Sequence, residues 1–170
     1  AMLSDHHARD LISTAALAFD ADHRIIGYRV DTVNNLGAYN SNFGQLMQTQ
    51  LFSRVLMGTY DVQATYLRTQ GFYTNTVYTD AYRGAGRPEA NYLLARMMDR
   101  AARELGVDVW DLHRINFIAP DKFPYKSATG ETYDVGDFAR VLDHADRFAD
   151  RAGFAARKQQ SEARGKLRGM

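Results

Sequence analysis

The sequence predicts an α+β fold in which antiparallel strands and hairpins come first and packed helices follow. Residues 1–80 are rich in β-branched and aromatic side chains with alternating polarity, which is typical of strands. Residues 81–170 carry apolar residues at helical spacing. Because the two patterns are segregated along the chain and no repeat or low-complexity linker divides them, we expect a single unit over residues 1–170.

In the first part, Asp10–Phe19 and Ile25–Val33 alternate in polarity around the turn cluster Asp20–Arg24, which predicts a hairpin. The Gly- and Asn-rich stretch Asn34–Gly44 is expected to be a loop. Three further elements complete this part: a helix over Gln45–Met57, a stop at Gly58, and one or two strands within Val62–Val77.

In the second part, Pro88 and Glu89 are suited to the first turn of a helix that Gly106 ends. One apolar stripe runs along this helix: Leu93, Leu94, Met97, Met98, Ala101 and Leu105. The remaining expected elements are a helix over Asp108–Ile118 capped by Asp108, a short hairpin over Phe123–Gly136, and helices over Asp137–Asp150 and about Phe154–Arg164.

Composition narrows the classes of function. The net charge of +1 and the pI of about 8.2 argue against a nucleic-acid-binding protein, and we expect no nucleic-acid partner. The chain has no cysteine, which excludes disulfides, zinc–thiolate sites, iron–sulfur ligation and cysteine nucleophiles within it. No apolar run is long enough to span a membrane and the polar start lacks a secretory signal, so we expect a cytoplasmic protein.

Candidate catalytic or metal-binding side chains are few. His6 and His7 are adjacent, and adjacent side chains on a strand point to opposite faces, which makes a poor metal pair. His113 beside an arginine on a helix is expected to be structural or exposed. Asp134 and Asp137 flank a glycine, and Asp137 is better explained as a helix N-cap than as a metal ligand. We therefore predict no metal ligand in this chain.

A glycine-containing stretch, Gly84–Ala85–Gly86, raises a more specific possibility. Glycines allow positive φ and let a ligand approach main-chain N–H groups, and the stretch feeds a helix N-terminus, where anions are favoured. Arg83 and Arg87 flank it and can add charge-assisted hydrogen bonds. The residues alone thus leave two interpretations open: a loop that binds an anionic ligand, or a structural turn.

The end of the chain is basic. Six positive charges face the single acid Glu162: Arg151, Arg157, Lys158, Arg164, Lys166 and Arg168. The stretch lacks the interleaved aromatic residues of a nucleic-acid surface, so a solvated helix whose end contacts more protein is the favoured interpretation.

Several motifs together resemble the large subunits of the molybdenum hydroxylases, the family of xanthine dehydrogenase, aldehyde oxidase and carbon monoxide dehydrogenase. They occur in family order: "HARD" at His7–Asp10, the hairpin and Gly-Ala-Tyr segment at Asp20–Tyr39, the loop "AYRGAGRPEA" at Ala81–Ala90, "FPYKSATGETYDVGDF" from Phe123, and "RGKLRG" from Arg164. The resemblance implies that residues 1–170 are one fragment of a molybdopterin-binding domain.

The resemblance also implies a cofactor and partners. The family carries molybdenum on molybdopterin or its cytosine dinucleotide and hydroxylates a carbon centre with oxygen from water. Tyr82, Arg83, Gly84, Ala85 and Gly86 would pass close to that cofactor, with Arg83 in contact with it or else in a structural salt bridge. Partner subunits would carry FAD and a [2Fe-2S] cluster and would join the rest of the large subunit in a hetero-oligomer.

Two differences from the family pattern bear on activity. In the carbon monoxide dehydrogenases that this family includes, the loop that corresponds to Ala81–Arg87 reads like Ala-Tyr-Arg-Cys-Ser-Phe-Arg, and its cysteine bridges molybdenum to copper. This chain has Gly84 at the position of that cysteine and contains no cysteine. Oxidation of carbon monoxide is therefore not expected. In the purine and aldehyde branch a Phe occupies the position of Ala85 and holds an aromatic substrate, which alanine cannot do.

The general-base glutamate of the family lies far beyond Met170, so no catalytic residue is expected here and the fragment should be inactive alone.

Three interpretations compete from the sequence. The first is a fragment of a molybdenum hydroxylase. The second is a separate anion- or nucleotide-binding module that uses Gly84–Gly86. The third is an assembly element that docks a partner through the basic stretch at Arg151–Arg168.

Overall fold

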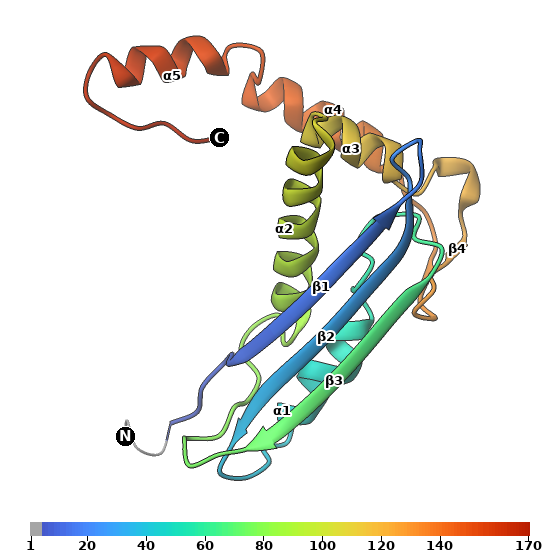
Figure 1. Ribbon diagram of the computed structural model, residues 1–170, viewed down its shortest axis with the longest axis vertical. Coiled ribbons are helices and arrows are strands. Elements are labelled where there is room, and N and C mark those ends of the chain that lie inside the picture. The colour runs from blue at the N-terminus through green and yellow to red at the C-terminus, as the bar shows by residue number, and fades with distance from the viewer. Residues whose placement is uncertain (1–4) are drawn as a thin grey trace.

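A three-stranded sheet organises the first half of the chain in the computed structural model, which describes residues 5–170 (Figure 1). The strands are β1 (Leu11–Phe19), β2 (Ile25–Gly37) and β3 (Thr65–Tyr73), in the order β1-β2-β3. β1 and β2 form the predicted antiparallel hairpin, with Leu11 opposite Asn34. The prediction of an α+β fold is thus confirmed in its content of a sheet and several helices.

The pairing of β3 differs from the expected antiparallel arrangement. β3 runs parallel to β2, with Tyr28 opposite Thr65 and Asn34 opposite Gly71. Antiparallel neighbours can be joined by a tight turn, but a parallel pair needs a connection that returns to the same end of the sheet. Residues 38–64 make that return and include a helical turn, so the prediction of antiparallel strands alone was wrong for this pair.

β2 also runs beyond its predicted end at Val33 and takes in Asn34–Gly37, which we had expected to be loop. Strand pairing on both sides overrides the low strand propensity of asparagine here. The side chain of Asn34 donates to the Gln70 carbonyl across the sheet, and Asn35 donates to Asp10 at 2.8 Å.

The helix predicted over Gln45–Met57 is shorter and irregular. It consists of α1 (Gly44–Leu46), a π-helix η1 (Met47–Leu51), a brief continuation at residues 52–53, and turns up to Gly58, where φ is 56°. Each hydrogen bond of a π-helix spans one residue more than in an α-helix, which shifts the side chains that follow.

The helices of the second half match their predicted positions closely. α2 (Arg87–Leu105) ends at Gly106, and α3 (Val109–Asn116) begins at Asp108, whose carboxylate accepts from two backbone N–H groups. After the 3₁₀ turn η2 (Pro120–Lys122) comes the short hairpin of β4 (Tyr125–Lys126) and β5 (Thr132–Tyr133), and then α4 (Phe138–Ala149) and α5 (Phe154–Glu162).

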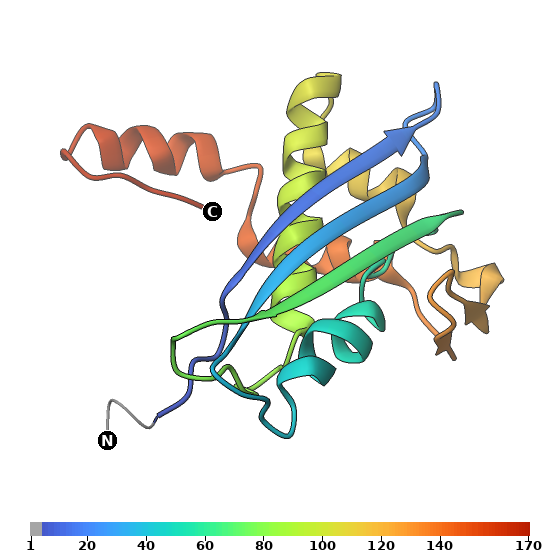
Figure 2. The same ribbon diagram turned by 60° about the horizontal axis from the view of Figure 1, so that its bottom comes forward.

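The core lies between one face of the sheet and α2, which crosses behind the strands (Figure 2). Its largest buried side chains come from β2, the 44–58 segment and the helices: Tyr28, Phe52, Leu56, Met98 and Leu112. By contrast, α4 has no buried residue, and α4 and α5 extend away from the sheet (Figure 1). No helix within residues 5–170 has the length and apolar character needed to cross a bilayer.

Candidate functional site: the loop before α2

The loop from Tyr82 to Gly86 has an unusual backbone. Three consecutive residues, Gly84, Ala85 and Gly86, have positive φ values of 97°, 43° and 88°. Alanine in this region costs about 1–2 kcal/mol, so the surrounding structure must hold the loop in place. Two hydrogen bonds do so locally: Ala85 N–H donates to the Tyr82 carbonyl at 2.8 Å, and Arg87 N–H donates to the Gly84 carbonyl at 3.1 Å.

The inner side of the loop rests on the π-helix. Gly86 is buried, and a Cβ atom added to it would lie 2.0 Å from the carbonyl oxygen of Met47. That distance is far below van der Waals contact with backbone, so only glycine allows this close approach. Gly86 is therefore needed for packing, whatever the loop binds.

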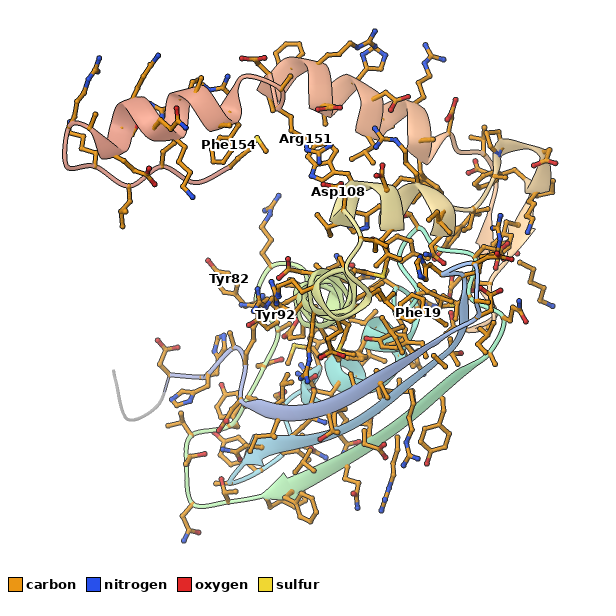
Figure 3. The ribbon with its side chains drawn as sticks, turned by 45° about the horizontal axis from the view of Figure 1, so that its top comes forward. Phe19, Tyr82, Tyr92, Asp108, Arg151 and Phe154 are labelled. Atoms are coloured by element: carbon orange, nitrogen blue, oxygen red, sulfur yellow. The ribbon has the colours of Figure 1, made fainter. Side chains whose placement is uncertain are left out.

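The outer side of the loop faces solvent. Tyr82, Arg83 and Gly84 are exposed, and the Tyr82 side chain projects from the loop beside α2 (Figure 3). Within residues 5–170, the N–H groups of Arg83 and Gly84 donate no hydrogen bond and the Arg83 guanidinium forms no ion pair. The structural salt bridge considered for Arg83 is thus absent from the described part of the chain.

A residue that the sequence reasoning did not single out connects the loop to the start of the chain. Arg9 pairs with Glu89 (Nε to Oε1, 3.1 Å), its guanidinium carbon lies 5.4 Å from the centroid of the Tyr82 ring, and its NH2 group donates to the Arg83 carbonyl at 3.4 Å. His7 forms an isolated parallel bridge with Thr79, which brings Arg9 to this place. No local sequence pattern could have revealed these contacts.

The remaining polar candidates have structural roles. His113 Nδ1 is 2.6 Å from the Tyr60 hydroxyl, and burial lowers the pKa of His113 from its ordinary value. Asp137 caps α4 by accepting from Arg140 N–H at 3.0 Å, as predicted. No group of three or more histidine, aspartate or glutamate side chains within residues 5–170 is placed to hold a metal ion.

Three of the six basic residues in the stretch form ion pairs within residues 5–170. Arg151 pairs with Asp108, Arg157 with Asp150, and Lys158 with Glu162 at 3.9 Å. These pairs favour the interpretation of α5 as a solvated helix over that of a concentrated positive surface.

Of the candidate sites described above, the loop Tyr82–Gly86 is the best suited to an anionic ligand. It offers two backbone N–H groups and an arginine side chain that have no partner among the described residues 5–170, and three small residues that leave the approach to them open. A molybdenum–pterin group, which carries a phosphate and oxygen ligands on the metal, has the chemistry that these donors suit.

Comparison with known proteins points the same way. The family model of the molybdopterin cofactor-binding domain matches residues 1–117. The chain is 35% identical over 157 residues to the carbon monoxide dehydrogenase large chain of Hydrogenophaga pseudoflava, covering 89% of this chain and 20% of that protein. It is 27% identical over 172 residues to the nicotine 6-hydroxylase large subunit of Paenarthrobacter nicotinovorans, covering 99% and 21%.

A solved structure shows the same arrangement of elements. Quinoline 2-oxidoreductase from Pseudomonas putida 86 matches with a TM-score of 0.87 and 29% identity, covering 96% of this chain and 21% of that one. The chain thus spans about a fifth of the length of these relatives.

Proposed function

The chain belongs to the molybdopterin cofactor-binding domain family, and on that premise we propose that Tyr82–Gly86 forms one wall of a molybdenum cofactor site. The observation that supports this most directly is the exposed outer side of the loop, where Arg83 and Gly84 present N–H groups that have no acceptor within residues 5–170. Unpaired donors on a glycine loop at a helix N-terminus favour a negatively charged ligand.

Each residue of the loop has a distinct part in this proposal. Arg83 donates charge-assisted hydrogen bonds to the anionic cofactor, and the Gly84 N–H adds a neutral one. Gly84 and Ala85 keep side chains away from the metal, while Gly86 fixes the loop against Met47. Tyr82, held below the guanidinium of Arg9, borders the site.

The bound cofactor would supply the redox chemistry of a hydroxylating oxidoreductase, and the protein would supply position and electrostatics. The reaction we propose is hydroxylation of a carbon centre with oxygen from water. Oxidation of carbon monoxide is not proposed, although two relatives are named carbon monoxide dehydrogenase large chains, because Gly84 has no side chain that could ligate copper and the chain has no cysteine. Ala85 also offers no ring to hold an aromatic substrate.

The wider assembly is likewise a proposal. Residues 1–170 would be one fragment of a molybdopterin-binding domain, inactive alone, with the general base and much of the pterin pocket in the rest of the large subunit. The names of two relatives, a large chain and a large subunit, support a hetero-oligomer. We propose that its other subunits carry FAD and a [2Fe-2S] cluster and that it is cytoplasmic.

The test is molybdenum and pterin analysis of the enzyme containing this chain, comparing wild type with Arg83→Ala. Loss of a charge-assisted hydrogen bond should weaken cofactor retention by about tenfold or more. Arg68→Ala, which removes an exposed arginine from the sheet instead, is the matched control. Wild-type protein without molybdenum would refute the proposed function. An equal molybdenum content in Arg83→Ala and Arg68→Ala would show that Arg83 does not contact the cofactor.

A further inference from the structure

A hollow of about 180 Å³ lies between the sheet and the π-helix η1, and it is lined by none of the loop residues Tyr82–Gly86. Strand β2 contributes Asn34 and Leu36, η1 and the residues beside it contribute Gln45, Gln48 and Thr49, and β3 contributes Thr69 and Gly71. The hollow is large enough for several water molecules, each of which takes up about 30 Å³ in liquid water.

Two buried oxygens that line this hollow lack hydrogen-bond partners within residues 5–170: Asn34 Oδ1 and Gln48 Oε1. The two residues are only 1% and 4% exposed. A buried acceptor left unpaired costs about 1–3 kcal/mol, and here two such atoms share one hollow. A bound donor at this place would satisfy both.

The orientation of Asn34 follows from its other hydrogen bond. Its Nδ2 donates to the Gln70 carbonyl at 3.3 Å, so turning the amide over would set two oxygens against each other. Thr69 adds a third oxygen, because its hydroxyl hydrogen is already donated to the Gln48 carbonyl at 3.1 Å. The hollow therefore presents acceptors to a ligand.

The same hollow has an apolar wall beside the acceptors. Gly71 lies against Leu36, with an added Cβ only 2.8 Å from Leu36 Cδ1, so the leucine side chain lies close to β3. An ammonium group has three donors and no acceptor, which matches the three oxygens, and an alkyl stem would contact Leu36. π-Helical turns such as η1 are also frequent at functional sites.

We propose that the hollow lined by Asn34, Gln48 and Thr69 binds a primary alkylammonium group. The group is either that of a free amine or the end of a lysine side chain from another part of the enzyme. This site is independent of the molybdenum proposal, since none of its residues belongs to the Tyr82–Gly86 loop.

The experiment is a titration of the protein with butylammonium chloride, followed by NMR at the side-chain amide signals of Asn34 and Gln48. Saturable shifts are expected with butylammonium and none with tetramethylammonium, which has the same charge but no N–H donor. Gln48→Met removes one acceptor at similar volume and should weaken binding by about 10- to 100-fold. Gln50→Met, a matched change on the same π-helix outside the hollow, should leave binding unchanged.

The source of the amine is distinguished by a crystal structure of the intact enzyme containing this chain, grown with butylammonium. Density for butylammonium at Asn34 and Gln48 supports a free amine, and a lysine Nζ in that place supports a protein donor. Water alone in the hollow overturns the proposal. So does a titration in which butylammonium and tetramethylammonium give equal shifts, or in which Gln48→Met binds as wild type does.

Discussion

Arg9 and Glu89 form an ion pair between the segment that leads into β1 and the first turn of α2, with 3.1 Å between Nε and Oε1. The carboxylate is almost fully buried, with 6% of the side chain exposed, whereas Arg9 is 36% exposed. The second carboxylate oxygen of Glu89 is buried and has no hydrogen-bond partner among residues 5–170. The pair thus places a buried carboxylate in the first turn of α2, which follows the proposed cofactor loop in the chain.

We expect Arg9→Met to lower the free energy of unfolding by about 1–3 kcal/mol, because it leaves the buried Glu89 carboxylate unpaired. Urea denaturation measures the change. Adding Glu89→Gln to this variant should recover part of the loss, since a neutral amide is cheaper to bury than an unpaired charge. If the double variant is less stable than Arg9→Met, the burial of the charge is not the cause.

Gly86→Ala should be more destabilising than an ordinary glycine substitution at positive φ. The new Cβ would meet the Met47 carbonyl oxygen at 2.0 Å, a backbone atom that cannot rotate away. Gly106→Ala is the matched control, because Gly106 has φ of 69° but no heavy atom of the described residues lies within 4 Å of the added Cβ. We expect about 1–2 kcal/mol for Gly106→Ala and a larger loss for Gly86→Ala, measured by thermal unfolding. Equal losses would show that the π-helix yields easily.

Stability should fall as the pH drops below about 6.5 in a manner that depends on His113. Burial lowers the pKa of His113 in the folded protein, with a smaller opposing effect of Asp108. The unfolded chain therefore binds more protons than the folded chain in this range, so unfolding becomes easier as pH falls.

Melting temperatures between about pH 7.5 and 5.5 measure this dependence. His113→Phe should flatten it, at the cost of the hydrogen bond to Tyr60. The exposed His144 serves as control, and His144→Gln should retain the wild-type slope. A wild-type slope in His113→Phe would assign the dependence to other groups.

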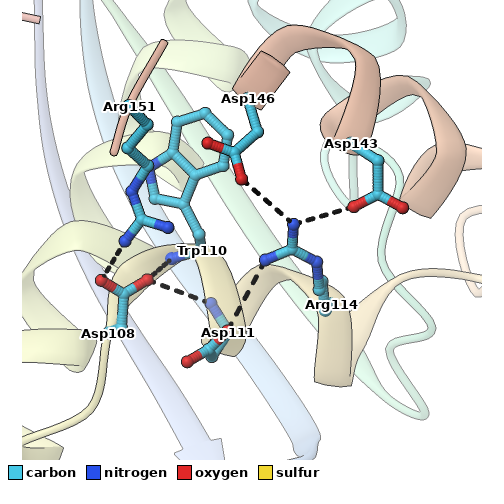
Figure 4. A network of polar contacts seen from close by, with 7 residues as sticks. All are labelled: Asp108, Trp110, Asp111, Arg114, Asp143, Asp146 and Arg151. Carbon is cyan, nitrogen blue, oxygen red and sulfur yellow. Dashed lines mark hydrogen bonds and ion pairs between the residues drawn. The ribbon is translucent and has the colours of Figure 1, made fainter. Parts of the chain in front are cut away.

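The attachment of α4 and α5 should depend on a small polar network beside α3 (Figure 4). Asp108 caps α3 through Trp110 N–H at 2.8 Å and pairs with Arg151, whose guanidinium lies 4.9 Å from the centroid of the Trp110 ring. Arg114 joins α3 to Asp143 of α4 at 2.8 Å. Because α4 buries no residue and, within residues 5–170, only its first residue, Phe138, contacts the aromatic rings of Phe117 and Phe123, these polar contacts matter more than they would on a packed helix.

We therefore expect Arg151→Met to increase cleavage by trypsin after residues of α4 and α5, measured as the rate of limited proteolysis. The free energy of unfolding of the sheet and α2 should change by less than about 1 kcal/mol, because the Arg151–Asp108 ion pair that is lost is partly exposed. Lys158→Met, which breaks an exposed pair within α5 only, is the control. Equal cleavage of the two variants would show that the network does not hold α4 and α5.

Most of the local elements follow from short-range features of the amino-acid sequence. The alternation in Asp10–Phe19, the caps at Asp108 and Asp137, and the glycine at 106 act over a few residues, so strands and helices formed close to where they were expected. The glycine loop and its flanking arginines were visible for the same reason. The structure confirmed their position before α2, and their contact with a cofactor stays a prediction.

Other features depend on contacts between segments that are far apart in the sequence, and these were seen first in the folded chain. The parallel pairing of β3, the extension of β2 to Gly37 and the π-helical turn at Met47–Leu51 each arise from packing against segments far away in sequence. The same long-range packing places Arg9 beside the loop and Asn34 in the same hollow as Gln48. Local propensity favours or disfavours a conformation by less than about 1 kcal/mol per residue, and burial and strand pairing together outweigh it.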